Sequence, residues 1–314
     1  HQVVRRQRQM CIRDSHISHY DVEWLRHNCY TMKSKKKYSS PYFLWDNSMQ
    51  SNFEDIQIDY QEIISGDEGI KKWLEQLHYK GISIVKNAPT EKESGFDVLS
   101  NISHHRETFF KTPFEVIDIP NPNNSAYTAA ALRNHIDLPY YEIAPGYQFL
   151  HCLINDATGG ESVALDGFKV ASYMKENFTE YFKILLDTPV KFVNRDYTAN
   201  TIRVMHKPIF TLDHNNDFND IRFSVAYMGI MDCSPEVMDS FYEAYRKLLS
   251  LLHDPMFEIN FRLEAGDIFS FNNRRVLHGR KEYDANSGNR HLQGYYIDRD
   301  EIVGRLNYLN RINP

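Results

Sequence analysis

Strict alternation of apolar and polar residues marks the clearest strand of the chain, at residues 257–263. The seven residues read FEINFRL, so every second side chain is apolar. Neighbouring side chains of a strand point to opposite faces, and this pattern therefore predicts a strand with one buried face. Shorter apolar runs between turn residues predict further strands at 82–85, 147–153, 162–165, 268–271 and 290–297.

Apolar residues recur at helical spacing in four other segments. Ile70, Trp73 and Leu77 lie three and four residues apart and predict a helix from residue 67, with Gly81 as the residue that ends it. The same spacing predicts three further helices, at 96–110, 166–186 and 235–252.

Short strands interrupted by long helices predict a protein that is mainly β with flanking helices, arranged as a double-sheet jelly roll. No repeat or low-complexity linker divides residues 16–314, and we expect them to form one domain. Residues 1–15 are rich in arginine and show neither a helix nor a strand period. We expect a disordered or non-native arm there, with a transit peptide as the alternative.

Composition and charge exclude several classes of protein. The chain has 42% hydrophobic and 25% charged residues, as soluble globular proteins do. Its net charge of -6 argues against a nucleic-acid partner, and no apolar run approaches the roughly 18 residues of a membrane span. The four cysteines lie far apart without a C-x-x-C pair, which is typical of free thiols in a reducing compartment. We expect a cytoplasmic protein, or a mitochondrial one if the source is eukaryotic.

His135 and Asp137 form an H-x-D triplet. In a strand their side chains would share one face, so that one imidazole and one carboxylate reach a common point. With a second imidazole they would form the two-His, one-carboxylate set that binds Fe(II) and leaves coordination positions open. The triplet alone is a weak signal, because a His at a strand end followed by an Asp in a turn gives the same letters.

A second imidazole is available in the C-terminal part of the chain. The apolar strand predicted at 268–271 leads to His278, and Arg290 follows twelve residues later. A guanidinium in that place can bind a carboxylate through two parallel hydrogen bonds. Taken alone, Arg290 would be read as a surface arginine. The order H-x-D, His, Arg makes the set specific and predicts a metal site made by His135, Asp137 and His278.

From about His19 to Arg311 the chain resembles the family of gamma-butyrobetaine dioxygenase and trimethyllysine dioxygenase. This family belongs to the wider group of taurine dioxygenase-like Fe(II)/2-oxoglutarate oxygenases. The resemblance is carried by the segments HYDVEWLRHNC, NNSAYT, NHIDLPYYEIAPGYQFLHCL, TGGES, DGF, FNNRRVLHGR and RHLQGYYIDRDEIVGRL.

The resemblance implies a double-stranded β-helix with catalytic Fe(II) held by His135, Asp137 and His278. Ser162 in TGGES and Arg290 would bind the remote carboxylate of the cosubstrate 2-oxoglutarate. O₂ would be the second cosubstrate, ascorbate the reductant, and the protein a homodimer. The longer relatives carry a small N-terminal zinc-binding domain, which we expect to be absent here or replaced by residues 1–15.

The resemblance also implies a small quaternary ammonium substrate, held in an aromatic cage by cation–π attraction worth up to ~2 kcal/mol per desolvated contact. Gamma-butyrobetaine, hydroxylated to carnitine, is the first candidate, and trimethyllysine or a trimethylammonio-phosphonate are alternatives. Ordinary core packing is the competing interpretation of the aromatic residues. The substrate-binding residues that the matching motifs imply are Phe110, Phe114, Asn124, Tyr127 and Tyr296.

Two departures from the family pattern concern the substrate. Phe110 and Phe114 stand where animal butyrobetaine enzymes carry more electron-rich rings. Ser224 and Val225, in a segment expected to be a strand, replace an Asn pair that relatives commonly show near the substrate. The second departure favours an alternative of another class, a jelly-roll binding protein without turnover. A zinc hydrolase is the weaker third reading, because Arg290 would lack a role.

Overall fold

The computed structural model of this protein describes residues 7–12, 16–27, 29, 42–117 and 128–312. Two compact units are present, His1–Pro41 and Tyr42–Pro314, and each is described by itself. In the first unit, strand β1 (Gln7–Ile12) pairs antiparallel with β2 (His16–Asp21), and helix α1 (Val22–His27) follows. The pattern of residues 1–15 did not predict strand β1. The residues of the predicted metal site lie in the second unit.

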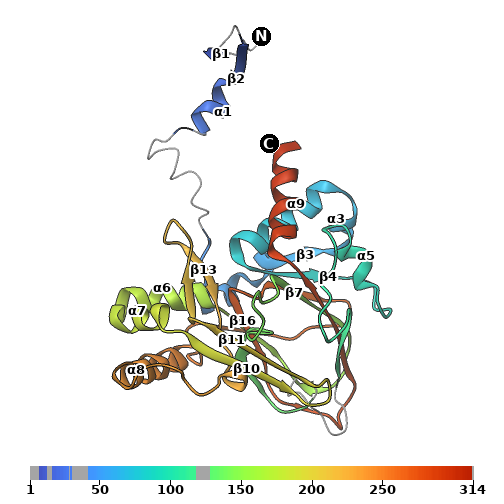
Figure 1. Cartoon of the computed structure of the whole chain (residues 1–314). Helices are drawn as coiled ribbons and strands as arrows, with labels where there is room; N and C mark the ends of the chain where they lie inside the picture. Colours follow the sequence, from blue (N-terminus) through green and yellow to red (C-terminus); the bar gives the residue numbers. More distant parts are fainter. Residues whose placement is uncertain (1–6, 13–15, 28, 30–41, 118–127, 313–314) are drawn as a thin grey trace. The chain divides into compact units, whose positions relative to one another are not determined.

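Two sheets form the centre of the second unit (Figure 1). A six-stranded sheet has the order β3-β4-β15-β7-β18-β5, and a four-stranded sheet has the order β14-β9-β16-β6. The strands of the first sheet are β3 (Gln57–Asp59), β4 (Ile82–Lys86), β5 (Phe114–Ile117), β7 (Tyr147–Asn155), β15 (Ile268–Asn272) and β18 (Arg290–Ile297). Those of the second are β6 (Leu132–His135), β9 (Ser162–Asp166), β14 (Glu258–Phe261) and β16 (Val276–Arg280).

The strand pairings are antiparallel apart from β3 with β4. Two facing antiparallel sheets with helices outside them make a jelly-roll-like fold, and the predicted fold class is confirmed. The second unit also contains two hairpins, β10 (Val190–Asp196) with β11 (Thr201–Lys207) and β12 (Phe210–Leu212) with β13 (Phe218–Ile221). A further short antiparallel pair, β8 (Thr158–Gly159) with β17 (Tyr283–Asp284), joins segments that are distant in the sequence.

The helices cover the sheets in two groups (Figure 1). Trp73 and Leu309 belong to a core cluster that also contains Phe149 of β7, so the first group packs on the six-stranded sheet. It comprises α3 (Tyr60–Ile64), α4 (Asp67–Glu75) with its continuation η2 (Gln76–Lys80), α5 (Gly95–Leu99) and α9 (Arg299–Ile312). The second group packs with Leu165 and Leu277 and comprises α6 (Gly167–Asn177), α7 (Thr179–Asp187) and α8 (Pro235–Leu251). Two short 3-10 segments are η1 (Asn47–Ile56) and η4 (Val225–Tyr227).

Two predicted helices differ from the structure. The helix expected at 96–110 is only α5, because the side chains of Ser100 and Asn101 bond to backbone carbonyls of the preceding turn and end it. The helix expected at 166–186 is interrupted at Phe178, whose φ of -140° and ψ of 52° are not helical. There Asn177 and Thr179 donate side-chain hydrogen bonds to carbonyls of the last turn of α6.

The strand prediction at 257–263 is correct in its burial pattern. Phe257, Ile259, Phe261 and Leu263 are all buried, and the hydrogen-bonded part of the strand is β14. Among the helices of the described residues, none combines the length and the apolar character that crossing a membrane requires. Cys29, Cys152 and Cys233 are free thiols.

Candidate active site

His135 and His278 face each other across two neighbouring strands of the four-stranded sheet. His135 is the last residue of β6, and in the antiparallel pairing it lies opposite His278 in the middle of β16. The two ring centroids are 4.4 Å apart. The strand pairing therefore brings together two imidazoles that are far apart in the sequence.

Asp137 lies beyond the end of β6, so the prediction that it shares a strand face with His135 is wrong. The loop holds it in another way: Asn273 accepts a hydrogen bond from the Asp137 N–H at 2.8 Å and donates one to the Asp137 carbonyl at 3.1 Å. Asn273 belongs to the FNN sequence that precedes β16. Since β16 carries His278, one segment positions two members of the predicted metal site.

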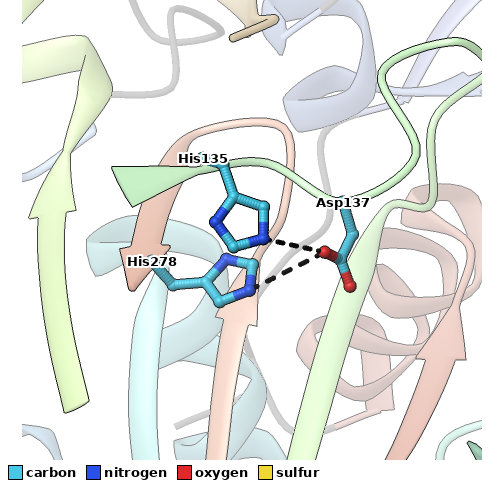
Figure 2. A group of neighbouring side chains, drawn as sticks. All are labelled: His135, Asp137 and His278. Carbon is cyan, nitrogen blue, oxygen red and sulfur yellow. Dashed lines mark ion pairs between the residues drawn. The ribbon is translucent and has the colours of Figure 1, made fainter. Parts of the chain in front are cut away.

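The three side chains converge on one point (Figure 2). Asp137 Oδ1 lies 3.3 Å from Nε2 of His135 and 3.8 Å from Nε2 of His278. One candidate ligand atom from each residue lies within 4.8 Å of the others. The convergence that the sequence required is present in the structure, and the role as metal ligands stays a prediction.

The hydrogen bonds around these groups leave the facing atoms available as ligands. The backbone carbonyl of Arg133 can only accept, so His135 Nδ1–H donates to it at 2.9 Å, and Nε2 is the nitrogen that faces Asp137. Tyr296 donates its hydroxyl to Asp137 Oδ2 at 2.6 Å, which leaves Oδ1. The donor set fits a divalent transition metal.

The protonation states also fit a metal site. Burial, together with the neighbouring His135, lowers the pKa of His278 to about 3, so its imidazole is neutral at neutral pH. Burial acts to raise the pKa of Asp137, but His135, His278 and the Tyr296 hydroxyl beside it outweigh burial and hold that pKa well below its ordinary value. Metal ligation needs a neutral imidazole and an ionised carboxylate.

Ser162 and Arg290 line a small cavity of about 70 Å³ together with the three predicted metal ligands. Ser162 begins β9, and the positive φ angles of Gly159 and Gly160 (84° and 74°) make the turn that leads to it. Burial and the nearby charge of Arg280 lower the pKa of Arg290 to about 10, so that its guanidinium is charged at neutral pH. Within the described part of the chain, no carboxylate forms an ion pair with Arg290.

Two further residues of this cavity were missed by the sequence reasoning. Arg280 and Gln148 both line it. Arg280 lies two residues after His278 on the same strand, so the rule that places alternate side chains on one face could have found it. Nothing in the sequence around Gln148 indicates that it lines a cavity, because only the pairing of β7 with β18 places it opposite Tyr296. With two guanidinium groups on its wall, the cavity suits an anion.

A larger cavity of about 350 Å³ adjoins the metal site and shares His135, Asp137 and Phe114 with the smaller one. Phe110, Phe114 and Tyr296 line it as predicted. The Phe114 and Tyr296 rings are stacked with their centroids 5.0 Å apart, and Phe110 lies 6.2 Å from Phe114. The other two residues predicted for the cage, Asn124 and Tyr127, lie outside the described residues.

The opposite wall of this cavity is formed by Ser224 and by η4, whose Tyr227 was not predicted. The segment 222–226, expected to be a strand, instead leads into this 3-10 turn. Tyr227 packs edge-on against Tyr140 with ring centroids 4.7 Å apart. Val225 and Tyr227 therefore make this side of the cavity more apolar than an Asn pair would.

Gly294 of β18 allows Phe114 to take its place in the wall. The two residues are opposite each other in the pairing of β5 with β18. A Cβ atom at position 294 would come within 2.0 Å of the Phe114 ring. The ring lies over the glycine, in a space that any side chain would fill.

Comparison with known proteins places this site among oxygenases. The family model described as taurine catabolism dioxygenase TauD, TfdA family matches residues 45–296. Gamma-butyrobetaine dioxygenase of Pseudomonas sp. (strain AK-1) is 34% identical over 301 residues, which cover 95% of this chain and 77% of the relative. The human gamma-butyrobetaine dioxygenase is 31% identical over 307 residues, covering 95% and 78%. Mitochondrial trimethyllysine dioxygenase of Mus musculus is 29% identical over 300 residues, covering 94% and 70%.

Solved structures share the fold at lower identity. The non-heme iron oxygenase OrfP in complex with Fe and alpha-ketoglutaric acid superposes with a TM-score of 0.56 at 14% identity, covering 74% of this chain and 80% of that one. Asparagine oxygenase in complex with Fe(II), hydroxyasparagine and succinate gives a TM-score of 0.57 at 14% identity, covering 77% and 93%. These likenesses support the jelly-roll fold described above.

Proposed function

This chain belongs to the TauD, TfdA family of dioxygenases, and from that premise we propose that it hydroxylates a small quaternary ammonium substrate with Fe(II) and 2-oxoglutarate. The resemblance read from the sequence motifs is confirmed, and the protein is an oxygenase. The observation that carries the proposal is the convergence of His135, Asp137 and His278 beside a cavity that contains the charged Arg290. Gamma-butyrobetaine is the first candidate substrate, because the relatives with 34% and 31% identity are named gamma-butyrobetaine dioxygenase.

His135, Asp137 and His278 would hold the iron, which supplies the oxidative chemistry when bound: O₂ and 2-oxoglutarate become succinate and CO₂ while a substrate C–H bond becomes C–OH. The backbone carbonyl of Arg133 accepts a hydrogen bond from Nδ1–H of His135, which would leave Nε2 to bind the iron. His278 is buried and the other two side chains are largely so, with exposed side-chain fractions of 14% for His135, 21% for Asp137 and 7% for His278. This arrangement limits unproductive access of solvent to the reacting atoms.

Arg290 and Ser162 would bind the remote carboxylate of 2-oxoglutarate. A guanidinium makes paired hydrogen bonds with a carboxylate, and a hydroxyl can add a third. Arg280 and Gln148 line the same small cavity and would strengthen its selectivity for a dianionic ligand over a neutral one. The cosubstrate would thus bridge the metal site and the half-buried arginine.

Phe110, Phe114 and Tyr296 would hold the quaternary ammonium group. Such a cation has no hydrogen-bond donor, and aromatic faces attract it electrostatically in a dry cavity. Tyr127 and Asn124 remain predicted members of this cage. The shared wall residues of the two cavities would place the substrate next to the iron.

A substrate panel tests the proposal. The purified protein is supplied with Fe(II), 2-oxoglutarate and ascorbate, and succinate and hydroxylated product are measured with gamma-butyrobetaine, trimethyllysine and a trimethylammonio-phosphonate. Succinate formed in equal amount to hydroxylated product with one of them is the expected result. Turnover of 2-oxoglutarate that no quaternary amine stimulates would remove the substrate class, whereas no binding of metal or 2-oxoglutarate would remove the enzyme assignment itself.

A different trimethylammonium compound is the second candidate substrate, and Val225 and Tyr227 favour it. Val225, together with Ser224, stands where the family pattern shows an Asn pair, and Tyr227 borders the same cavity, so the group of the substrate that faces them is expected to differ. The same departure is the reason to retain a non-catalytic binding protein as an outcome of the panel.

We also propose that the protein works as a cytoplasmic or mitochondrial homodimer with a single catalytic domain over residues 16–314.

A further inference from the structure

We propose that Tyr296 is a positioning residue that joins the substrate cavity to the metal centre. Its hydroxyl orients the carboxylate of Asp137, and its ring is part of the wall that faces the substrate. The inference rests on the proposed metal site. It assigns to Tyr296 a role toward the metal in addition to its predicted place in the aromatic cage.

The hydroxyl selects which oxygen of Asp137 faces the imidazoles. It donates to Oδ2 at 2.6 Å, while Oδ1 is the oxygen that lies near both Nε2 atoms. Asn273 fixes only the backbone of Asp137, so the side chain could still rotate about its own bonds. A carboxylate without the tyrosine bond could turn Oδ1 away or present both oxygens to the metal. Partners of this kind commonly change metal affinity by 10–100-fold.

The ring of Tyr296 is itself held by the aromatic wall. It is 1% exposed and stacks on Phe114 at an interplanar angle of 25°. The contacts continue from Phe114 to Phe110, from Phe110 to Phe109 at 4.1 Å, and from Phe109 to the guanidinium of Arg203 at 4.4 Å. Because the ring cannot turn freely within this stack, the hydroxyl is delivered to Asp137 in one orientation.

One side chain therefore contacts both ligand sites. A substrate pressed against the ring restricts the same residue that holds the metal-binding carboxylate. By linkage, a substrate that favours this orientation also raises the affinity for the metal. Removing the hydroxyl should weaken metal binding and leave the cavity wall in place, whereas removing the ring should weaken both.

The experiment compares Tyr296→Phe with Tyr295→Phe. Tyr295 is the neighbouring residue of β18; it is fully buried, and its hydroxyl donates to Gln293 in the core on the other face of the sheet. Binding of Mn(II), a probe that needs no turnover, is followed by electron paramagnetic resonance of the free ion. We expect Tyr296→Phe to raise the dissociation constant about 10-fold or more, and Tyr295→Phe to leave it within about twofold.

Unchanged Mn(II) affinity in Tyr296→Phe would overturn the inference, as would an equal loss in Tyr295→Phe. Tyr296→Leu provides the second arm: substrate affinity should fall in this variant and persist in Tyr296→Phe. Thermal unfolding of the metal-free variants shows whether they are folded. The Mn(II) measurement uses no substrate, so failure of every quaternary amine in turnover would contradict the proposed function and leave this result standing.

Discussion

At the scale of single residues, the site depends on which atom of each side chain remains available as a ligand after the other atoms have made their hydrogen bonds. His135 donates Nδ1–H to a carbonyl, and Asp137 accepts a hydroxyl on Oδ2. The atoms that remain, Nε2 of His135 and Oδ1 of Asp137, face the same point as Nε2 of His278. Arg290 is the corresponding case for charge, because it is half-buried, ionised and without a carboxylate partner in an ion pair within the residues that the structure describes.

Arg290→Ala should therefore raise the KM for 2-oxoglutarate much more than the KM for the amine substrate. The loss of charged hydrogen bonds worth ~2 kcal/mol corresponds to about a 30-fold change. Initial rates measured while each substrate is varied in turn check this. Equal increases in both KM values would contradict the carboxylate role.

His151 predicts how the stability of the metal-free protein depends on pH. Its ring is fully buried, and burial lowers its pKa from 6.5 to about 4. Between these values the unfolded chain binds a proton that the folded protein does not, so the free energy of unfolding falls as the pH drops from about 6.5 to about 4, by up to ~1.4 kcal/mol per unit.

Urea denaturation of the wild type and His151→Leu, in the presence of a chelator, measures this contribution. The wild type should lose more stability than the variant between pH 6.5 and pH 5. Parallel pH profiles of the two proteins would show that His151 does not contribute.

At the scale of elements, β18 supplies both ligand cavities from one face. Arg290 and Leu292 line the small cavity, Gly294 lies under Phe114, and Tyr296 lines the larger cavity. These positions are two residues apart, as one face of a strand requires. The proposed sites for 2-oxoglutarate and substrate therefore both border β18, and Tyr296 of the same strand contacts the predicted metal ligand Asp137.

Gly294→Ala tests this alignment. The added methyl group would displace the Phe114 ring from the wall, since the Cβ would lie 2.0 Å from a ring atom. We expect the substrate KM to rise about 10-fold or more, stability to fall by ~1–3 kcal/mol, and Mn(II) affinity to fall as well, because Tyr296 stacks on the displaced ring.

Gly304→Ala in α9 is the matched control, because nothing lies within 4 Å of a Cβ there. It should change neither KM nor Mn(II) affinity. If Gly294→Ala has wild-type substrate kinetics, Phe114 is not part of the substrate wall.

At the scale of the whole molecule, a buried ion pair joins parts of the second unit that are distant in sequence. Asp166 at the end of β9 and Arg275 just before β16 are 0% exposed and make two hydrogen bonds of 2.9 and 2.7 Å. Asp166 also accepts the backbone N–H groups of Trp45 and Phe168. Arg275 donates further to the carbonyls of Tyr79 and Phe43. These bonds connect the four-stranded sheet, α6, η2 and the start of the unit.

Arg275→Met should destabilise the protein by ~3–5 kcal/mol, because it leaves the Asp166 carboxylate buried without its partner. Lys183→Met is the control, since the Lys183–Glu180 pair is exposed at 57% and 78% and should contribute little. Urea denaturation compares the two. A loss in Arg275→Met no larger than in the control would show that the pair does not hold these elements together.

Local pattern in the sequence predicted much of the fold. The strands at 82–85, 147–153 and 257–263, and a helix beginning at Pro235, are present because burial of one face imposes a period on the residues of the element itself. Where side chains competed for backbone hydrogen bonds, as at Ser100 and around Phe178, the same reasoning failed. An apolar period shows which face is buried and says nothing of a polar side chain that ends a helix.

The candidate site, too, could be predicted from the sequence only in part. The sequence alone predicted the kinds of ligand, two imidazoles, a carboxylate and an arginine in order, because the chemistry of a metal and a keto acid requires them. Only the tertiary structure decided that His278 lies opposite His135, that Asp137 is held by a loop and Asn273, and that Gln148 and Tyr227 border the cavities. The reason is that these relations depend on the register between strands more than one hundred residues apart and on how the intervening chain returns, and no local period encodes either one.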